Sequence, residues 1–243
     1  MAAPLLEIAG LTKRFGGVYA NRDVTFDVRH GEIVGLIGPN GAGKTTLFNL
    51  VTGFIRPDAG TVRFDGADVT GMRPDRLCHR GVARTFQILK PFPRLTVEEN
   101  VMIGALARGD AMESARATAR RALASVGLEH KRDGLARGLS TGQRKRLEMA
   151  RALATGPRLL LLDEITGGVD QPSIPGLIDL VGSLRSEGLT LLVIEHNMRV
   201  IMSLADRVVF LHLGEKLAEG APREITAHPE VVSLYLGRRR DGH

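Results

Sequence analysis

The sequence predicts an α/β fold with a largely parallel sheet. Short runs that are apolar throughout, rather than alternating, are typical of parallel strands buried on both faces. Such runs occur at Ile33–Ile37, Leu159–Leu162 and Leu189–Ile194. The first leads through a glycine-rich segment into a helical pattern that begins at Lys44, and a helical pattern at Ile174–Arg185 separates the other two. Strands that alternate with helices in this way favour a parallel sheet covered by helices.

The remaining elements divide the chain into three stretches. Between about residues 6 and 64 short β-type runs are separated by turn residues, which predicts a β-rich layer. Between about residues 88 and 152 helical periodicity predicts a lobe of helices. Further strands are expected at Leu6–Ile8, Val24–Val28, Thr61–Phe64, Arg207–Leu213 and Lys216–Ala218. Further helices are expected at Val97–Leu106, Glu113–Val126, Thr141–Ala154 and Glu230–Leu236.

Composition indicates an ordinary globular protein. The 243 residues are 43% hydrophobic and 25% charged, no apolar run approaches the about 18 residues that span a bilayer, and the first residues lack a secretory-signal pattern, so a cytosolic chain is expected. Its net charge of +6 is spread along the chain and aromatic residues make up only 4%, which argues against nucleic-acid binding. The single Cys78 excludes an internal disulfide, and the histidines show no zinc-site spacing.

The segment GPNGAGKTT has the pattern of a phosphate-binding loop between a strand and a helix. Glycines let the backbone wrap closely around phosphate, so that N–H groups face the anion. Lys44 is expected to contact the β and γ phosphates, Thr45 to bind Mg²⁺, and Thr46 to bind another phosphate oxygen. The residues expected to bind the nucleotide in this segment are Gly38, Asn40, Gly41, Ala42, Gly43, Lys44, Thr45 and Thr46. The sequence therefore predicts a nucleoside triphosphate site with Mg²⁺.

Two carboxylates, Asp163 and Glu164, directly follow the strand expected at Leu159–Leu162. Open α/β sheets present ligand groups at the carboxyl ends of their strands. Asp163 is therefore expected to hold the magnesium, and Glu164 to orient or deprotonate an attacking water. His196 follows another apolar run, but a single histidine in such a place is more often a packed or solvated residue.

The motifs occur in an order that resembles one family. GPNGAGKTT, TFQ, LSTGQRKRLEMARAL, LLLLDE, Asp170 and His196 follow one another as in the ATPase subunits of ABC transporters, and the resemblance covers essentially the whole chain. It implies a P-loop NTPase fold of ABC type, with a RecA-like mixed sheet core, an antiparallel β layer and an inserted helical lobe. It further implies one nucleotide-binding domain at residues 1–243, with the core and β layer at 1–87 and 153–243 and the lobe at 88–152.

The resemblance assigns roles to residues around the bound ATP. Phe15 is similar to the aromatic residue that stacks on adenine, and Gln87 to the glutamine that senses magnesium and water. His196 is similar to the switch histidine, which reverses the interpretation of this residue taken alone. Glu164, His196 and Gln87 are thus the expected catalytic residues, and Thr45, Gln87 and Asp163 the expected metal-binding residues.

Other residues are implied to act across a dimer. Ser140 and Gly142, with Gln143 beside them, resemble the signature residues that bind the γ-phosphate held by a second subunit, and Asp170 resembles the aspartate that communicates across the interface. Each ATP would then be completed by another ATPase subunit, identical or related. Three places depart from the common pattern: Thr141 stands where many members have glycine, Ile165 replaces a proline, and Gly168–Asp170 varies the usual ending of its segment. Since proline fixes φ, the backbone after Glu164 is expected to be less restrained.

Within the family, the chain is most similar to the ATPases of high-affinity branched-chain amino acid importers, through GVARTFQILKPFPRLTVEENV, IEHNM and GAPREITAHPEVVSLYLG. The resemblance implies that MgATP hydrolysis drives uptake of branched-chain amino acids or related small polar solutes. Partners would be integral membrane permease subunits and, indirectly, an external substrate-binding protein, with this subunit peripheral on the cytoplasmic face of the cell membrane. The alternatives are an ATPase for lipopolysaccharide export and a soluble ABC ATPase without a transport role.

Overall fold

The computed structural model describes residues 3–86 and 91–236. The chain forms two units. The first combines Met1–Pro74 with Thr190–His243, and the second is Asp75–Leu189. The expectation of one domain with a lobe at 88–152 stays a prediction.

The first unit contains an antiparallel sheet with strand order β2-β1-β4-β5. Its strands are β1 Leu6–Phe15, β2 Val18–Val28, β4 Ala59–Phe64 and β5 Ala67–Asp68. The sheet has one buried face, because Leu6 and Ile8 on β1 and Val62 and Phe64 on β4 are buried while the residues between them are more exposed. This alternation is typical of an antiparallel sheet with one face exposed to solvent.

The second sheet of this unit has the order β10-β9-β3-β8. Its strands are β3 Ile33–Ile37, β8 Thr190–Ile194, β9 Arg207–His212 and β10 Glu215–Gly220, and its helices are α1 Lys44–Val51, α7 Met198–Leu204, α8 Pro222–Ala227 and α9 Pro229–Leu236. β3 lies parallel to both β8 and β9, and β10 returns antiparallel to β9. Every residue of β3 and β8 is buried, as their mainly apolar, non-alternating sequences predict.

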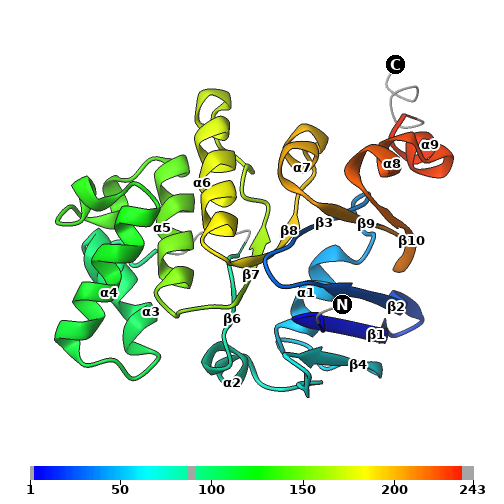
Figure 1. The fold of residues 1–243 in the computed structure, drawn as a ribbon, viewed down its shortest axis with the longest axis horizontal. Helices are drawn as coiled ribbons and strands as arrows, with labels where there is room; N and C mark the ends of the chain where they lie inside the picture. Colours follow the sequence, from blue (N-terminus) through cyan, green and yellow to red (C-terminus); the bar gives the residue numbers. More distant parts are fainter. Residues whose placement is uncertain (1–2, 87–90, 237–243) are drawn as a thin grey trace. The chain divides into compact units, whose positions relative to one another are not determined.

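The second unit combines a pair of parallel strands with helices. The strands are β6 Val82–Arg84 and β7 Leu159–Asp163, and the α-helices are α2 Pro74–His79, α3 Val97–Leu106, α4 Met112–Ser125, α5 Thr141–Leu153 and α6 Ile174–Ser186. Short 3₁₀ turns lie at Glu129–Lys131, Ala136–Gly138 and Gln171–Ser173. Helices α3, α4 and α5 pack against one another (Figure 1). Gly104 on α3 permits close packing, because a Cβ there would lie 2.4 Å from the Arg151 carbonyl oxygen.

The predicted fold class is confirmed, with buried parallel strands, an antiparallel layer and a group of helices. The sequence did not predict α2, β6, α7 or α8, all of which are short. Strands β1 and β2 are longer than expected, because they continue to a tight turn at Gly16 and Gly17 where Gly16 has φ of 55°. Within residues 3–86 and 91–236, no helix is both long and apolar enough to cross a bilayer.

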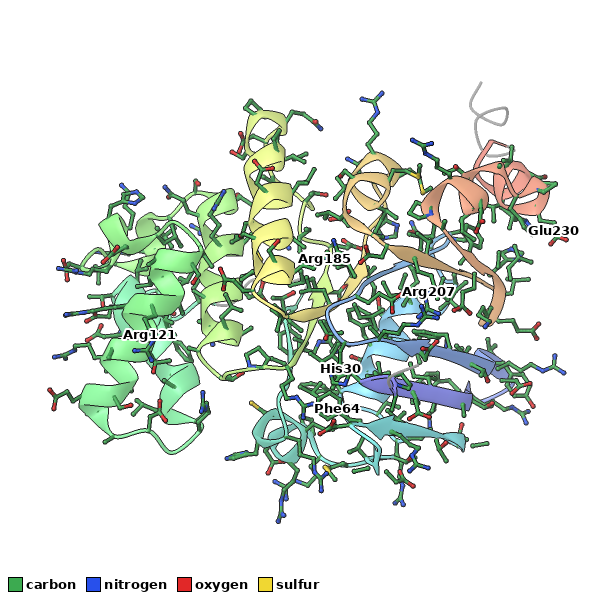
Figure 2. All side chains as sticks on the ribbon, viewed as in Figure 1. His30, Phe64, Arg121, Arg185, Arg207 and Glu230 are labelled. Atoms are coloured by element: carbon green, nitrogen blue, oxygen red, sulfur yellow. The ribbon has the colours of Figure 1, made fainter. Side chains whose placement is uncertain are left out.

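Arg207, labelled in Figure 2, lies at the centre of a cluster of charges that joins three strands and a connecting turn of the first unit. Arg207 Nε lies 2.9 Å from Glu32 Oε1 and its Nη1 lies 3.0 Å from Asp27 Oδ1. The same guanidinium pairs with Glu219 on β10. The carboxylates around it raise the pKa of Arg207 further above its usual value. Because its side chain is only 16% exposed, the guanidinium is needed to balance the negative charge of the three carboxylates.

Removing this guanidinium should destabilise the protein. Arg207→Met is expected to lower the free energy of unfolding by about 2 kcal/mol at pH 7, because it leaves Glu32, Asp27 and Glu219 without their shared cation. Urea unfolding at pH 7 measures this loss. Arg29→Met is the control, since Arg29 is 65% exposed and 4.0 Å from Asp27, and should change stability by less than about 0.5 kcal/mol. Equal losses in the two variants would contradict the prediction.

Candidate functional site

The phosphate loop connects β3 to α1, as predicted, and its conformation requires glycine at two positions. Gly38 has φ of 152° and Gly43 has φ of 97°. A Cβ at Gly38 would lie 2.1 Å from the Leu211 carbonyl oxygen, and one at Gly43 would lie 2.2 Å from the Ala20 carbonyl oxygen. No side chain fits at such distances, so the loop backbone closes tightly against the strands beside it.

Lys44 is buried at the first position of α1, with 5% of its surface exposed. Its Nζ donates to the carbonyl oxygens of Gly38 at 2.7 Å and Pro39 at 2.9 Å. The ammonium therefore lies within the curve of the loop, where the helix N-terminus also favours anions. Thr45 is exposed on the first turn of α1, and Thr46 is half-buried beside it. Asn40 and Gly41 are exposed, while Ala42 is buried.

Asn21 is a supporting residue that the sequence did not reveal. It is fully buried on β2, and its Nδ2 donates to the Gly43 carbonyl oxygen at 3.3 Å. This bond ties the end of the phosphate loop to the antiparallel layer. No local pattern in the sequence marks Asn21, because its partner lies 22 residues away.

The other two candidates in the first unit are exposed. Phe15 ends β1 with half of its surface exposed, and Lys13 Nζ lies 5.6 Å from its ring centroid. An exposed aromatic ring at a strand end is available for stacking. His196 lies two residues beyond the end of β8, and its backbone N–H donates to Glu195 Oε2 at 3.2 Å. His196 thus follows a buried strand, as predicted, and its side chain is exposed.

In the second unit, Asp163 is the last residue of β7 and is 2% exposed. Its carboxylate pairs with Arg84 on the neighbouring strand β6, with Arg84 Nη2 3.2 Å from Asp163 Oδ2. Burial raises the pKa of Asp163, and the positive charge of Arg84 opposes that shift. Burial also lowers the pKa of Arg84. Arg84 is a second residue that the sequence did not single out, since 79 residues separate it from Asp163.

The residues expected to hold Mg²⁺ offer the donors that this ion prefers. Asp163 provides a carboxylate at a strand end and Thr45 an exposed hydroxyl at a helix start. Mg²⁺ is commonly held by one or two carboxylates together with substrate phosphates and waters. Among the described residues no cluster of three or more His, Cys, Asp or Glu side chains could hold a metal ion. Oxygen donors of this kind fit Mg²⁺ better than a metal that needs several nitrogen or sulfur ligands.

The signature segment begins helix α5, as predicted. Ser140 is the N-cap, and its Oγ accepts a hydrogen bond from the Gln143 N–H at 3.3 Å. The Gln143 side chain returns the contact, since its Oε1 accepts from the Ser140 N–H at 3.0 Å. This capping box leaves Ser140 exposed at the positive end of a helix of 13 residues.

Gly142 and Asp170 belong to two segments that contact each other. A Cβ on Gly142 would lie 3.7 Å from both Ser173 Cβ and Val169 Cγ1. Asp170 is exposed and its Oδ2 accepts from Ser173 Oγ at 2.8 Å. The first turn of α5 therefore packs against the segment that carries Asp170. Gln87 lies outside the described residues.

Glu148 on α5 is a half-buried carboxyl group that no motif identified. Its Oε1 accepts a hydrogen bond of 2.6 Å from the Phe86 N–H, next to the segment that leads to Gln87. Burial raises the pKa of Glu148 to about 7, and the Phe86 hydrogen bond only partly offsets this rise. A carboxyl group with such a pKa changes its charge near neutral pH.

Two family models of known proteins match parts of this chain. The family model described as ABC transporter matches residues 21–167, and the model described as branched-chain amino acid ATP-binding cassette transporter matches residues 215–241. The chain therefore belongs to the ABC transporter family and is an ATP-binding cassette ATPase of that family.

Two curated relatives are similar over nearly their whole length. The high-affinity branched-chain amino acid transport ATP-binding protein BraF of Pseudomonas aeruginosa is 39% identical, with 98% of this chain and 99% of BraF covered. The protein of the same description named LivG in Escherichia coli is 36% identical, with the same coverage. The chain is thus similar from end to end to the ATP-binding proteins of two amino acid transport systems.

Solved structures are similar as well. An ATP-binding cassette of an ABC transporter in its ADP conformation has a TM-score of 0.89 and 32% identity, covering 97% of this chain and 100% of that one. A dimeric bacterial ABC transporter cassette has a TM-score of 0.80 and 29% identity, covering 90% and 99%.

The pKa of Glu148 predicts how stability depends on pH. A carboxyl group has a pKa near 4.3 in an unfolded chain, so the folded protein binds the Glu148 proton more tightly. The stabilisation that comes from this tighter proton binding is complete below about pH 4. It is lost as the pH rises to about 7. Glu148→Gln should therefore be more stable than the parent by about 1–3 kcal/mol at pH 8, with a smaller gain at pH 5 that vanishes below about pH 4.

Urea unfolding at pH 5, 7 and 8 tests this dependence. Glu113→Gln, at an exposed position on α4, is the control and should change stability by less than about 0.5 kcal/mol at each pH. A Glu148→Gln protein that is less stable than the parent at pH 8 would show that the Phe86 hydrogen bond outweighs desolvation.

Proposed function

We propose that this chain is the ATP-hydrolysing subunit of an importer for branched-chain amino acids. The observation that carries the ATPase assignment is the phosphate loop, whose glycines lie against backbone carbonyls and whose buried Lys44 lies inside the curve of the loop. The amino acid assignment is supported by identity of 36–39% to BraF and LivG along the whole chain. This full-length similarity favours import over the alternative of lipopolysaccharide export.

The phosphate loop would bind the nucleotide through backbone and charge. Loop N–H groups and the start of α1 favour phosphate oxygens. We propose that these oxygens take the place of the Gly38 and Pro39 carbonyls as partners of Lys44. Asn40, Ala42 and Thr46 would complete the contacts of the loop, and Phe15 would stack on the adenine ring.

The second group of residues would act on the γ-phosphate and the attacking water. Thr45, Asp163 and Gln87 would hold Mg²⁺, which neutralises charge on the β and γ phosphate oxygens when bound. Glu164 would accept the proton of the attacking water, and His196 would donate a hydrogen bond to the γ-phosphate or the water. These roles require little covalent chemistry, because phosphoryl transfer depends mainly on positioning and on charge stabilisation.

A second ATPase subunit would complete each site. We propose that Ser140, Gly142 and Gln143 of one subunit bind the γ-phosphate held by the other, aided by the positive end of α5. Asp170 would communicate across the same interface. The dimeric cassette among the similar structures supports this arrangement. The ATPase dimer would then drive separate membrane permease subunits at the cytoplasmic face of the cell membrane, with an external binding protein supplying the amino acid.

Two variants should separate binding from hydrolysis. Lys44→Ala should weaken MgATP binding more than about tenfold, since it removes the charge inside the loop. Glu164→Gln should keep MgATP affinity within about twofold and reduce kcat at least about hundredfold, because the amide cannot take the proton of the water. Binding is measured by equilibrium titration with fluorescent ATP and kcat by phosphate release. Parent-like kcat in Glu164→Gln would remove Glu164 from its proposed role.

Substrate class is tested in the organism that carries this gene. Replacing the chromosomal gene by its Glu164→Gln form should reduce uptake of radiolabelled leucine, isoleucine and valine at least about tenfold, because the transporter then lacks its energy source. Uptake of an unrelated solute in the same cells is the control. Unchanged uptake of all three amino acids, together with loss of uptake of urea or an amide, would contradict the substrate assignment and leave the ATPase assignment standing.

A further inference from the structure

The backbone of Glu164 has an unusual conformation. Its φ is 50°, in the left-handed region that residues with a Cβ seldom adopt. Such conformations persist only where the surroundings over-determine them, and they concentrate at functional sites. Whatever fixes the main chain of Glu164 also fixes where its carboxylate begins, so the contacts of this residue are relevant to the proposed chemistry.

Two hydrogen bonds hold the carbonyl group of Glu164. The Gly167 N–H donates to it at 3.2 Å, which closes a turn over residues 164–167. Lys145 Nζ donates to the same oxygen at 2.8 Å from helix α5. The next residue, Ile165, is 2% exposed and anchors the turn in the core. The left-handed conformation of Glu164 is therefore held by a local bond, a buried side chain and a bond from a different element.

The contact from Lys145 is specific. Lys145 is 5% exposed, and burying an ammonium group is unfavourable unless hydrogen bonds compensate it. A charged donor also makes a shorter and stronger bond than a neutral one. Lys145 and Glu164 are 19 positions apart in the sequence, so this hydrogen bond is a tertiary contact. A buried methionine of similar length would fill this space without the desolvation cost, so the lysine indicates a need for the donor.

The position of Lys145 on α5 links this contact to the signature segment. Ser140 caps α5 and Gly142 lies in its first turn, and Lys145 follows Gly142 by three residues on the same face of the helix. Gly142 itself packs against Val169 and Ser173, beyond the same turn. Helix α5 thus contacts the segment from Glu164 to Ser173 at two places, and a shift of this helix would be transmitted to both.

We propose that Lys145 is a positioning residue for Glu164, holding the backbone of that glutamate in its left-handed conformation and so coupling the signature helix to the group that activates water. This inference rests on the proposed function, because it requires Glu164 to act on the water. The N-terminal end of α5, which we propose contacts the nucleotide bound by the second subunit, would then also determine the position of Glu164 in its own subunit.

Steady-state kinetics of the full-length protein with MgATP test the proposal. Lys145→Met should reduce kcat about 10–100-fold while the affinity for fluorescent MgATP stays within about twofold, because a misplaced base affects the transition state more than binding. Lys145→Arg, which keeps a charged donor, should retain kcat within about threefold. Lys145→Gln keeps a polar group but is too short for this contact, and it should lose kcat like the methionine variant.

Arg146→Met is the matched control on the same helix. Arg146 donates to the carbonyl oxygens of Val126 at 2.9 Å and Gly176 at 2.8 Å, so its loss also removes charged bonds from α5 to backbone carbonyls. It should lower the urea midpoint and leave kcat within about twofold. Equal loss of kcat in Arg146→Met and Lys145→Met would overturn the proposal, since the effect would then be general loosening of α5. Parent-like kcat in Lys145→Met or in a folded Lys145→Gln protein would overturn it as well.

A double variant separates this inference from the proposed function. If Glu164→Gln alone leaves hydrolysis unchanged, the role in hydrolysis that we propose for Glu164 is wrong. If Glu164→Gln abolishes hydrolysis and Lys145→Met does not reduce it, only the role of Lys145 fails. The expected result is that Lys145→Met lowers the residual rate of Glu164→Gln by less than about twofold, because the group that it positions is already absent. A further loss of tenfold or more would indicate that Lys145 acts elsewhere.

Discussion

Complete burial of the short parallel strands is the constraint on which the arrangement of the site depends. Every residue of β3, β7 and β8 is buried, so ligand-binding side chains have little room along these strands. Polar chemistry is therefore confined to the residues that end or follow them: the phosphate loop after β3, Asp163 and Glu164 at the end of β7, and His196 after β8. The apolar core thus fixes where the chemistry lies, and a strand that shifted by one residue would move its site residue to another face.

The charged groups at these strand ends are compensated within the protein. Lys44 donates to loop carbonyls, Asp163 pairs with Arg84, and Lys145 donates to the Glu164 carbonyl. A buried charge without such partners would destabilise the fold. The contacts of Lys44 and Asp163 also limit how strongly a ligand can bind, because a phosphate or metal ion must replace a partner that the protein already supplies. These two contacts therefore influence both the stability of the fold and its affinity for ligand.

The extent to which sequence predicts this structure follows from the range of each interaction. The observed bounds of helix α3 match the prediction from helical periodicity, which is a local signal, and a capping box of Thr96 and Glu99 begins the helix in the structure. The loop, the strand ends and the start of α5 are local as well. By contrast, β6 has three residues, which is too short for a periodic signal. The pair between Arg84 and Asp163 and the left-handed φ of Glu164 arise from tertiary packing, which single-sequence patterns do not encode.

Ile165 shows how a departure from a family pattern can have a structural reason. The sequence alone suggested a less restrained backbone here, since isoleucine does not fix φ as proline does. The structure shows restraint by other means, because Ile165 is buried and the Glu164 carbonyl accepts bonds from Gly167 and Lys145. A proline at position 165 would also drive Glu164 toward extended φ values, against its observed φ of 50°. Isoleucine at position 165 permits the left-handed backbone conformation of Glu164, and Lys145 stabilises it. The two residues therefore act together on the same backbone conformation.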